Sequence, residues 1–329
     1  MLSSFFFALE AITPIFILVV LGYVLKRIGL VPQEFAKAAN KLVFRVFLPA
    51  SLFLNVYRIP HFGSINFAYI VYAIAVVLVL FLLGIPTVMA VSAQSERRGP
   101  CLQAIFRSNY ALVGLPLAGA LFGTEGEMVA SLLSAAAIPT FNVLAVISLS
   151  VFSAEGEKPS PRKILLGIAK NPLILSVGAG LLALAVRALL VRWGVTWRLS
   201  DITPLYTVLG YLGNVATPLA LLVLGMQFEF SAVKALRREI VFATLARVVV
   251  APLLGIGIAY LLFRNSFNGA HFAAFVALFA TPVAVSSVPM TQEMHGNTAL
   301  AGQIVVFTTL FSSISIFLAS FLLRLAGIF

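Results

Sequence analysis

Ten apolar runs, each long enough to cross a lipid bilayer, limit what this chain can fold into. A bilayer core of about 30 Å requires roughly 20 apolar residues per helical span. Helices are the expected form, because a lipid-exposed backbone must satisfy its own hydrogen bonds, and the alternating ten-residue strands typical of a barrel are absent from the sequence. The expected spans are approximately 9–25, 38–57, 66–92, 101–122, 127–152, 164–191, 203–226, 238–263, 271–294 and 299–326.

The composition excludes a water-soluble enzyme. The chain is 61% hydrophobic and 10% charged, whereas soluble domains carry about 45–50% apolar and about 25% charged residues. The sequence contains no phosphate-binding glycine loop, no H-E-x-x-H and no G-x-S-x-G. The three histidines, His61, His271 and His295, fall at span ends. We therefore expect an all-α integral membrane protein that is not an enzyme and has no cofactor and no metal site.

The distribution of basic residues predicts how the chain lies in the membrane. The net charge of +11 would suggest a nucleic-acid partner in a soluble protein, but here Lys and Arg cluster at the ends of apolar runs. With the N-terminus outside, twelve of them fall in cytoplasmic connections and six in external ones. The positive-inside rule thus predicts a multi-pass protein of the plasma (inner) membrane with both termini outside.

The longest polar stretch, 153–163, has charges and two prolines and reads as a short cytoplasmic loop. It divides the chain into halves, 1–152 and 164–329, of five spans each. Because five is odd, two equivalent halves must lie in opposite orientations, which is the inverted-repeat plan of many secondary transporters. Weak internal symmetry agrees, since the pairs Pro116/Pro289 and Gly123/Gly296 are both 173 residues apart.

The fourth and ninth spans carry the clearest interruptions of helical sequence. Gly114 and Pro116 interrupt the fourth span, and Pro282 and Pro289 interrupt the ninth. Proline removes a backbone donor and clashes with the preceding turn, and unpaired backbone at membrane depth is tolerated only inside protein or around a wet cavity. A packing kink explains any one of these prolines, but matched interruptions in both halves indicate a binding site.

Polar residues beside these interruptions are candidate ligands for a substrate. Asn109 precedes Gly114, while Ser286 and Ser287 lie between the two prolines of the ninth span. Half-helix N-termini at the interruptions would present amide N–H groups that suit an anion. Asn142 in the fifth span must also find a partner, either in a substrate cavity or on another helix.

A few charged residues within the spans are candidates for a charge or coupling role. Arg45 and Arg247 lie deep and have no obvious acidic partner in the sequence, so they would attract an anion or be satisfied by helix C-terminal carbonyls. Arg107 and Lys170 are expected to lie near helix ends and to snorkel to the interface. Glu293, beside His295, is the best candidate for a titrating group.

Five stretches of this sequence resemble the auxin efflux carrier family of membrane transporters. They are TPIFILVVLGYVLKRIGLVPQEFAKAANKLVFRVFLPASLF, RSNYALVGLPLAGALFG, KNPLILSVGAGLL, TPLALLVLGMQF and ATPVAVSSVPMTQEMHGNTALAGQIVVFTTLFSS. Together they extend over the whole chain. The central loop is only about eleven residues long, so the chain resembles bacterial members rather than plant PIN-type carriers.

The resemblance implies ten helices in two inverted five-helix repeats, with helices 4 and 9 broken and crossing at prolines. It also implies a scaffold domain and a crossover (transport) domain, each built from both repeats, that move past each other in an elevator-type cycle, and a homodimer. By motif position, Asn109 would hold a substrate carboxylate, Gly114 and Pro116 would belong to the helix-4 crossing, and Pro282 to the helix-9 crossing. This chain has Ser287 where PIN-type carriers have a second crossover proline, with Pro289 two residues later.

Three functions therefore remain open from the sequence. The first is a secondary transporter of a small organic anion, a mono- or dicarboxylate such as malonate, malate or an auxin-like compound. The second is a sodium-coupled symporter of the related bile-acid type. The third is a membrane receptor or channel that lacks alternating access.

Overall fold

The computed structural model describes residues 2–58, 67–152, 162, 166 and 169–329, and every regular element within these residues is helical. Seven of the described stretches are long and apolar enough to cross a membrane, and α13 (Gly269–Phe279) is a shorter apolar helix. The expectation of an all-helical integral membrane protein is confirmed. The predicted loop 153–163 lies outside the described residues except for Arg162.

The described elements follow the expected spans to within a few residues at most boundaries. In chain order they are α1 (Leu2–Arg27), α2 (Gln33–Leu42), the π-helical η1 (Val43–Phe47), α3 (Leu48–Tyr57), α4 (Phe67–Val91), α5 (Ser95–Phe106), the π-helical η2 (Tyr110–Gly114), α6 (Leu115–Val151), α8 (Pro172–Arg192), the 3₁₀ turn η3 (Leu199–Asp201), α9 (Thr203–Gln227), α10 (Phe230–Ala235), α11 (Arg237–Leu245), the π-helical η4 (Ala246–Val250) and η5 (Leu253–Gly257), α12 (Ile258–Phe263), α13, α14 (Ser287–Glu293) and α15 (Thr298–Leu325).

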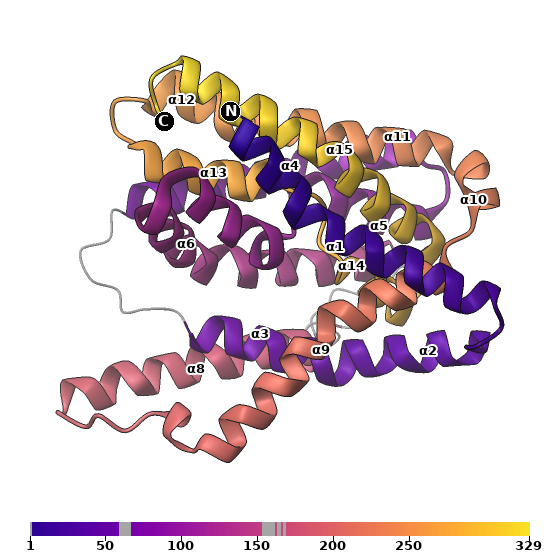
Figure 1. Cartoon of the computed structure of the whole chain (residues 1–329), viewed down its shortest axis with the longest axis horizontal. Coiled ribbons are helices and arrows are strands. Elements are labelled where there is room, and N and C mark those ends of the chain that lie inside the picture. Colours follow the sequence, from indigo (N-terminus) through magenta and orange to yellow (C-terminus); the bar gives the residue numbers. More distant parts are fainter. Residues whose placement is uncertain (1, 59–66, 153–161, 163–165, 167–168) are drawn as a thin grey trace.

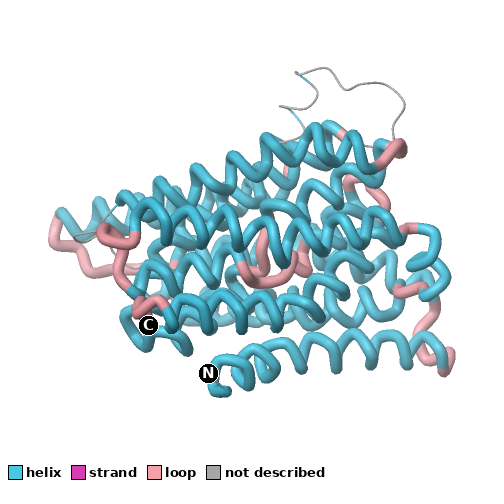
Figure 2. Tube along the Cα trace, turned by 90° about the horizontal axis from the view of Figure 1, so that it is seen from above, coloured by secondary structure: helices cyan, strands magenta, loops and turns pink. Residues whose placement is uncertain are grey.

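The helices fall into two groups by their packing. One group contains α1, the α2–α3 span, α8 and α9, and we call it the panel; the other contains α4–α6 and α11–α15, and we call it the bundle. In Figure 1, α2, α3, α8 and α9 lie along the lower side of the molecule, and the bundle lies above them. Figure 2 shows the long helices running side by side along a common direction.

Close backbone contact joins α1 to α9 in the panel. A Cβ atom at Gly225 of α9 would overlap the carbonyl oxygen of Val19 in α1, and a Cβ at Gly22 of α1 would overlap the carbonyl oxygen of Leu222. Membrane helices without a hydrophobic drive to associate gain dispersion energy by this kind of close approach. The two glycines therefore fix how near α1 and α9 lie.

The share of buried residues in each helix distinguishes peripheral helices from core helices. In α8 the buried residues Leu173, Val177, Gly180 and Leu184 recur at helical spacing and form one stripe toward α3, while the other apolar faces are exposed. In α13, by contrast, every residue except His271 is buried. A helix that is apolar all round belongs in the interior, and α13 accordingly packs against α6 at the centre of the bundle.

A tight turn inside α6 separates the predicted fourth and fifth spans. Phe122 and Gly123 leave helical geometry, and Gly123 has φ +62° and ψ −154°, a conformation that only glycine adopts readily. After the turn the chain folds back on itself, so that a Cβ at Gly126 would overlap the carbonyl oxygen of Ala118. The two limbs of α6 are therefore antiparallel, as the separate runs 101–122 and 127–152 predict.

Polar contacts tie several helix ends together at the end of the molecule where α5 and α15 begin. Arg97 and Glu239 form a 3.0 Å ion pair that links α5 to α11. The N–H of Asn297, which caps α15, donates to the carbonyl oxygen of Glu96 at 2.9 Å. We call this the α5 end; the opposite end contains the turn at Gly123 and the last turn of α15.

Substitution of Gly225 tests the contact between α1 and α9. We expect Gly225→Ala to destabilise the protein by about 1–3 kcal/mol, because the added methyl group forces backbone apart. Gly210→Ala is the matched control, since it lies in the same helix with no atom within 4 Å of the added Cβ. The measurement is the thermal unfolding midpoint in detergent micelles, and equal midpoints for the two variants would contradict the close contact.

Candidate functional site

Two helix interruptions meet inside the molecule. α5 ends at Phe106, and residues 107–109 are not helical before η2 begins; α13 ends at Phe279, and residues 280–286 are not helical before α14 begins. The backbone N–H of Asn109 donates to the carbonyl oxygen of Pro282 at 2.7 Å. The fourth and ninth spans are therefore both interrupted, and the two breaks are in direct contact. The break in the fourth span lies at 107–109, ahead of the predicted Gly114 and Pro116, which are in helical elements, whereas Pro282 lies within the break of the ninth span.

Other elements hold the second interruption in place. Arg247 of η4 is fully buried and donates to the carbonyl oxygens of Leu278 and Thr281, both at 2.7 Å. The hydroxyl of Thr308 in α15 accepts the N–H of Val283 at 3.3 Å. Backbone groups freed by the break thus find partners inside the protein, as the membrane requires.

Arg107 belongs to the first interruption, and its side chain reaches Ser286 in the second. It is 3% exposed. One terminal nitrogen donates to Ser286 Oγ at 2.8 Å and Asn142 Oδ1 at 3.1 Å; the other donates to Gln103 Oε1 and Met290 Sδ, both at 2.8 Å. All four partners are neutral, and no described carboxylate lies within 4.0 Å of Arg107. The site therefore contains a buried positive charge without a counter-charge from the described residues.

Two further polar groups at the first interruption have no hydrogen-bond partner in the part of the chain that the structure describes. Asn109 Nδ2 and Ser108 Oγ are buried, and neither has a hydrogen bond to any described residue. Gly114 lies so close to α13 that a Cβ atom there would be 2.9 Å from the carbonyl oxygen of Ala277. The first break thus packs against the end of α13 while keeping donors unused.

A pocket of about 720 Å³ lies between the panel and the first interruption. Pro116, Ala111 and Leu112 contribute the bundle side, at the N-terminal turns of η2 and α6 where helix dipoles favour negative charge. The polar lining comes from α3 and α9, namely Ser51, Asn55, Asn214 and Thr217. Neither Arg107 nor Asn109 lines this pocket, so it lies next to the interruptions and does not contain them.

On the side toward the α5 end, polar side chains close the contact between panel and bundle. Asn40 of α2 donates to the side-chain oxygens of Gln292 in α14 and of Gln227 in α9, the latter at 3.3 Å, and Gln227 donates to Gln292 at 3.0 Å. We call these three residues the amide cluster. Beside it, Arg45 of η1 and Glu293 of α14 lie 3.7 Å apart. Asn40 itself is fully buried.

The structure brings some predicted site residues together and separates others. Asn142 and Ser286 both accept hydrogen bonds from Arg107, and Asn109, two residues after Arg107, bonds to Pro282. Pro116 lines the neighbouring pocket, while the Ser287 hydroxyl bonds to Ala284 in its own chain segment. Arg45 and Glu293 lie apart from the interruptions, and the hydrogen bonds of Arg247 there go to backbone carbonyl oxygens. The sequence left two partners open for Arg247, an anion or carbonyl oxygens at a helix C-terminus. The observed contacts are of the carbonyl kind, at the end of α13.

Two expectations from the sequence were wrong. Arg107 does not snorkel: α5 begins at Ser95, within a polar stretch, so Arg107 follows a helix of 12 residues and lies about 18 Å from its start. Arg45 does have an acidic partner, Glu293, 248 residues away in the chain.

The residues of the amide cluster and the polar lining of the pocket were not singled out from the sequence. The only available signal for Arg107 was a cation directly before a helix break.

The chain belongs to the membrane transport protein family, that of the auxin efflux carriers, which it matches over residues 7–320. An "uncharacterized transporter" of Methanothermobacter thermautotrophicus is 24% identical over 317 residues, which cover 93% of this chain and 95% of that protein. A "putative malonate transporter" of Rhizobium meliloti is 26% identical over 259 residues, which cover 74% of this chain and 73% of that protein. This protein is therefore a membrane transporter by family.

Thr308→Val tests whether α15 holds the second interruption. The variant keeps the shape of the side chain but leaves the Val283 N–H without its acceptor, and a buried unpaired donor costs about 1–3 kcal/mol. Thr309→Val is the matched control, because its buried hydroxyl bonds only to Val305 in its own helix. We expect a lower unfolding midpoint for Thr308→Val than for Thr309→Val; the reverse order would remove Thr308 from this role.

Proposed function

We propose that this protein is a secondary carrier of a small organic anion, a mono- or dicarboxylate, bound where the two interruptions meet. The observation that carries the proposal is the buried Arg107 guanidinium with only neutral partners among the described residues. An unpaired charge is costly inside a membrane protein, and a guanidinium matches a carboxylate in both charge and geometry. A bound anion would supply the missing negative charge.

In this proposal each residue near the break has a defined task. Arg107 neutralises the carboxylate, and Asn109 Nδ2 and Ser108 Oγ, which have no described partner, donate hydrogen bonds to it. Asn142 and Ser286 position the guanidinium. The pocket at Pro116 admits the substrate, and its volume falls within the range of about 300–1,000 Å³ seen for small-molecule sites.

We further propose that the ten expected spans form two inverted repeats and that helices 4 and 9 cross at the interruptions. In this assignment α1, α2–α3, α4, α5 to Phe122 and the remainder of α6 form one repeat, and α8, α9, α11–α12, α13–α14 and α15 form the other. The positions of the breaks support it, since Ala280 follows Arg107 by 173 residues, the same spacing as Pro289 after Pro116.

Alternating access is the mode of transport that we propose for these units, with the panel as scaffold and the bundle as the moving part. The pocket lies toward the end where α1 begins, whereas the amide cluster closes the opposite side. By the distribution of Lys and Arg we assign the α5 end to the cytoplasm. The described arrangement then corresponds to a carrier open to the outside and closed to the cytoplasm.

Uptake into proteoliposomes tests the substrate proposal. We expect saturable uptake of at least one of labelled malonate, malate, lactate and indole-3-acetate, tested with and without sodium. Arg107→Gln and Asn109→Ala should each reduce uptake about 10-fold or more, because a charge-assisted hydrogen bond contributes about 1.5–3 kcal/mol. Arg237→Gln, an exposed site outside the interruptions, serves as the control.

Each outcome of this assay discriminates between functions. Failure of folded wild-type protein to take up any of the four acids would contradict the carboxylate proposal. Wild-type uptake by Arg107→Gln would remove the guanidinium from the site. Sodium-independent transport would exclude the sodium-coupled symporter, and substrate counterflow would exclude a channel, because only a carrier cycle produces it.

Cysteine labelling tests alternating access separately from substrate identity. The single native cysteine, Cys101, is buried, so we expect the thiol reagent to label only the introduced cysteine. We expect a membrane-impermeant thiol reagent to label Asn214→Cys in the pocket from outside, and to label Asn40→Cys only slowly from the cytoplasmic side. Saturating substrate should change the two rates in opposite directions. Parallel changes would contradict alternating access.

A further inference from the structure

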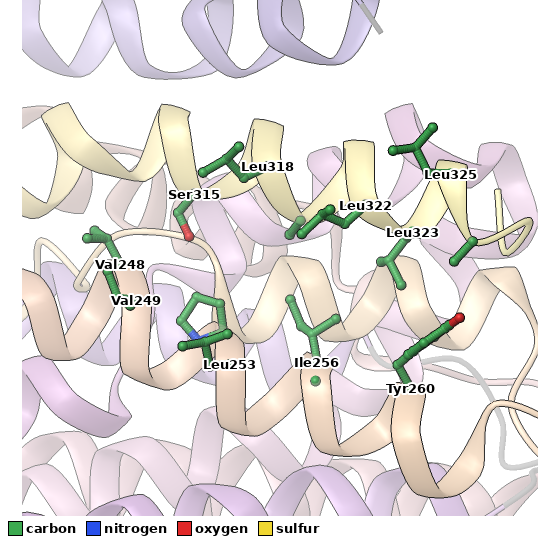
Figure 3. A pocket seen from close by; sticks show the side chains of 14 residues that line it. Val248, Val249, Leu253, Ile256, Tyr260, Ser315, Leu318, Leu322, Leu323 and Leu325 are labelled. Atoms are coloured by element: carbon green, nitrogen blue, oxygen red, sulfur yellow. The ribbon is translucent and has the colours of Figure 1, made fainter.

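A second cavity lies on the outer surface of the bundle, away from the interruptions. It is a groove of about 600 Å³ between the η4–α12 stretch and α15 (Figure 3). Its lining is almost wholly apolar; Ser315 and Tyr260 carry the only side-chain polar atoms. The lining residues are Val248, Val249, Pro252, Leu253, Ile256, Gly257, Tyr260, Ser315, Leu318, Ala319, Leu322, Leu323, Leu325 and Ala326.

The sequence of the η4–α12 stretch explains why the groove exists. Pro252 separates two π-helical turns, η4 and η5, and both proline and π-bulges distort regular helical packing. Gly257 lacks a side chain, and a Cβ atom placed there would meet nothing within 4 Å. Ala319 and Ala326 are the small residues on the opposite wall. Little side-chain volume therefore fills the space between the two helices.

The groove has the length and position of one half of a bilayer. From Val248 to Tyr260 the wall extends 12 residues, which is about 18 Å at the rise of a helix, and half of a hydrocarbon core is about 15 Å. Leu253 and Leu322 on its rim are 64% and 61% exposed. Since these helices are apolar enough to span a membrane, the open side of the groove faces lipid hydrocarbon.

One end of the groove carries positive charge. Arg264 lies over the ring of Tyr260, with the guanidinium carbon 6.0 Å from the ring centroid. Arg324 lies between the lining residues Leu323 and Leu325 in the last turn of α15. Both arginines are exposed, and neither forms an ion pair with a described carboxylate. This cationic end is where phosphate groups of the adjacent leaflet would lie.

We propose that the groove binds one phospholipid, with an acyl chain between η4–α12 and α15 and the phosphate at Arg264. An acyl chain fits an apolar groove that runs along the helices and ends near mid-membrane, and the arginine supplies the charge that a phosphate requires. The lipid packs on the face of α15 remote from the amide cluster and binds independently of any transported substrate.

Native mass spectrometry of delipidated protein, titrated with dioleoyl phosphatidylglycerol, tests the proposal. We expect Gly257→Leu, which fills the groove, to weaken binding of the first lipid about 10-fold or more. Gly178→Leu in α8 is the matched control, because its added side chain also meets open space. Arg264→Gln should weaken binding at least several-fold, whereas Arg192→Gln at the end of α8 should not.

Three outcomes would overturn the proposal. Equal lipid binding by Gly257→Leu and Gly178→Leu would exclude the groove, and unchanged binding by Arg264→Gln would exclude the phosphate contact. A wild-type dimer that Gly257→Leu alone converts to monomer would show that a second copy of the chain occupies the groove. Should Gly257→Leu fail to fold, Ala319→Phe fills the groove from the α15 wall and gives the same comparison.

Discussion

The hydrogen bond between the Asn109 N–H and the Pro282 carbonyl joins two helix interruptions that meet inside this membrane protein. Breaking a helix in lipid exposes backbone groups that water cannot satisfy. Here Arg247, Thr308 and the opposite break provide the partners. These contacts let the breaks on either side of η2 and α13 be buried inside the protein.

The same region concentrates the polar chemistry of the chain. Arg107, Arg247, Asn109 and Asn142 are all at least nine-tenths buried. Among the described residues, both arginines donate hydrogen bonds only to neutral groups. Elsewhere, two carboxylates form ion pairs near helix ends, Glu239 with Arg97 and Glu293 with Arg45. Among the described residues, the interior around the interruptions thus holds two guanidinium groups without a carboxylate partner.

The sequence predicted most helix boundaries to within a few residues, because the bilayer imposes length and apolarity on each span. It also predicted an interruption in the fourth and in the ninth span, but only Pro282 lies within a non-helical segment. Gly114, Pro116 and Pro289 lie in helical elements, and the first break comes at 107–109, where the sequence has neither glycine nor proline. The prediction that Arg107 lies near the membrane interface failed. The helix before Arg107 begins already within the polar stretch SERRGP, so Arg107 lies a full 12-residue helix away from that end. The sequence also missed the partner of Arg45 and the amide cluster, because their members come from elements that are distant in the chain and meet only after packing.

The uncompensated guanidinium of Arg107 has an electrical consequence. Moving one elementary charge across the membrane potential requires about 2.3 kcal/mol per 100 mV. In the carrier that we propose, a monocarboxylate beside Arg107 lowers the charge of the moving unit by one, whereas the empty unit carries the charges of both Arg107 and Arg247. The membrane voltage would therefore act more strongly on the return of the empty protein and bias it toward the negative side of the membrane.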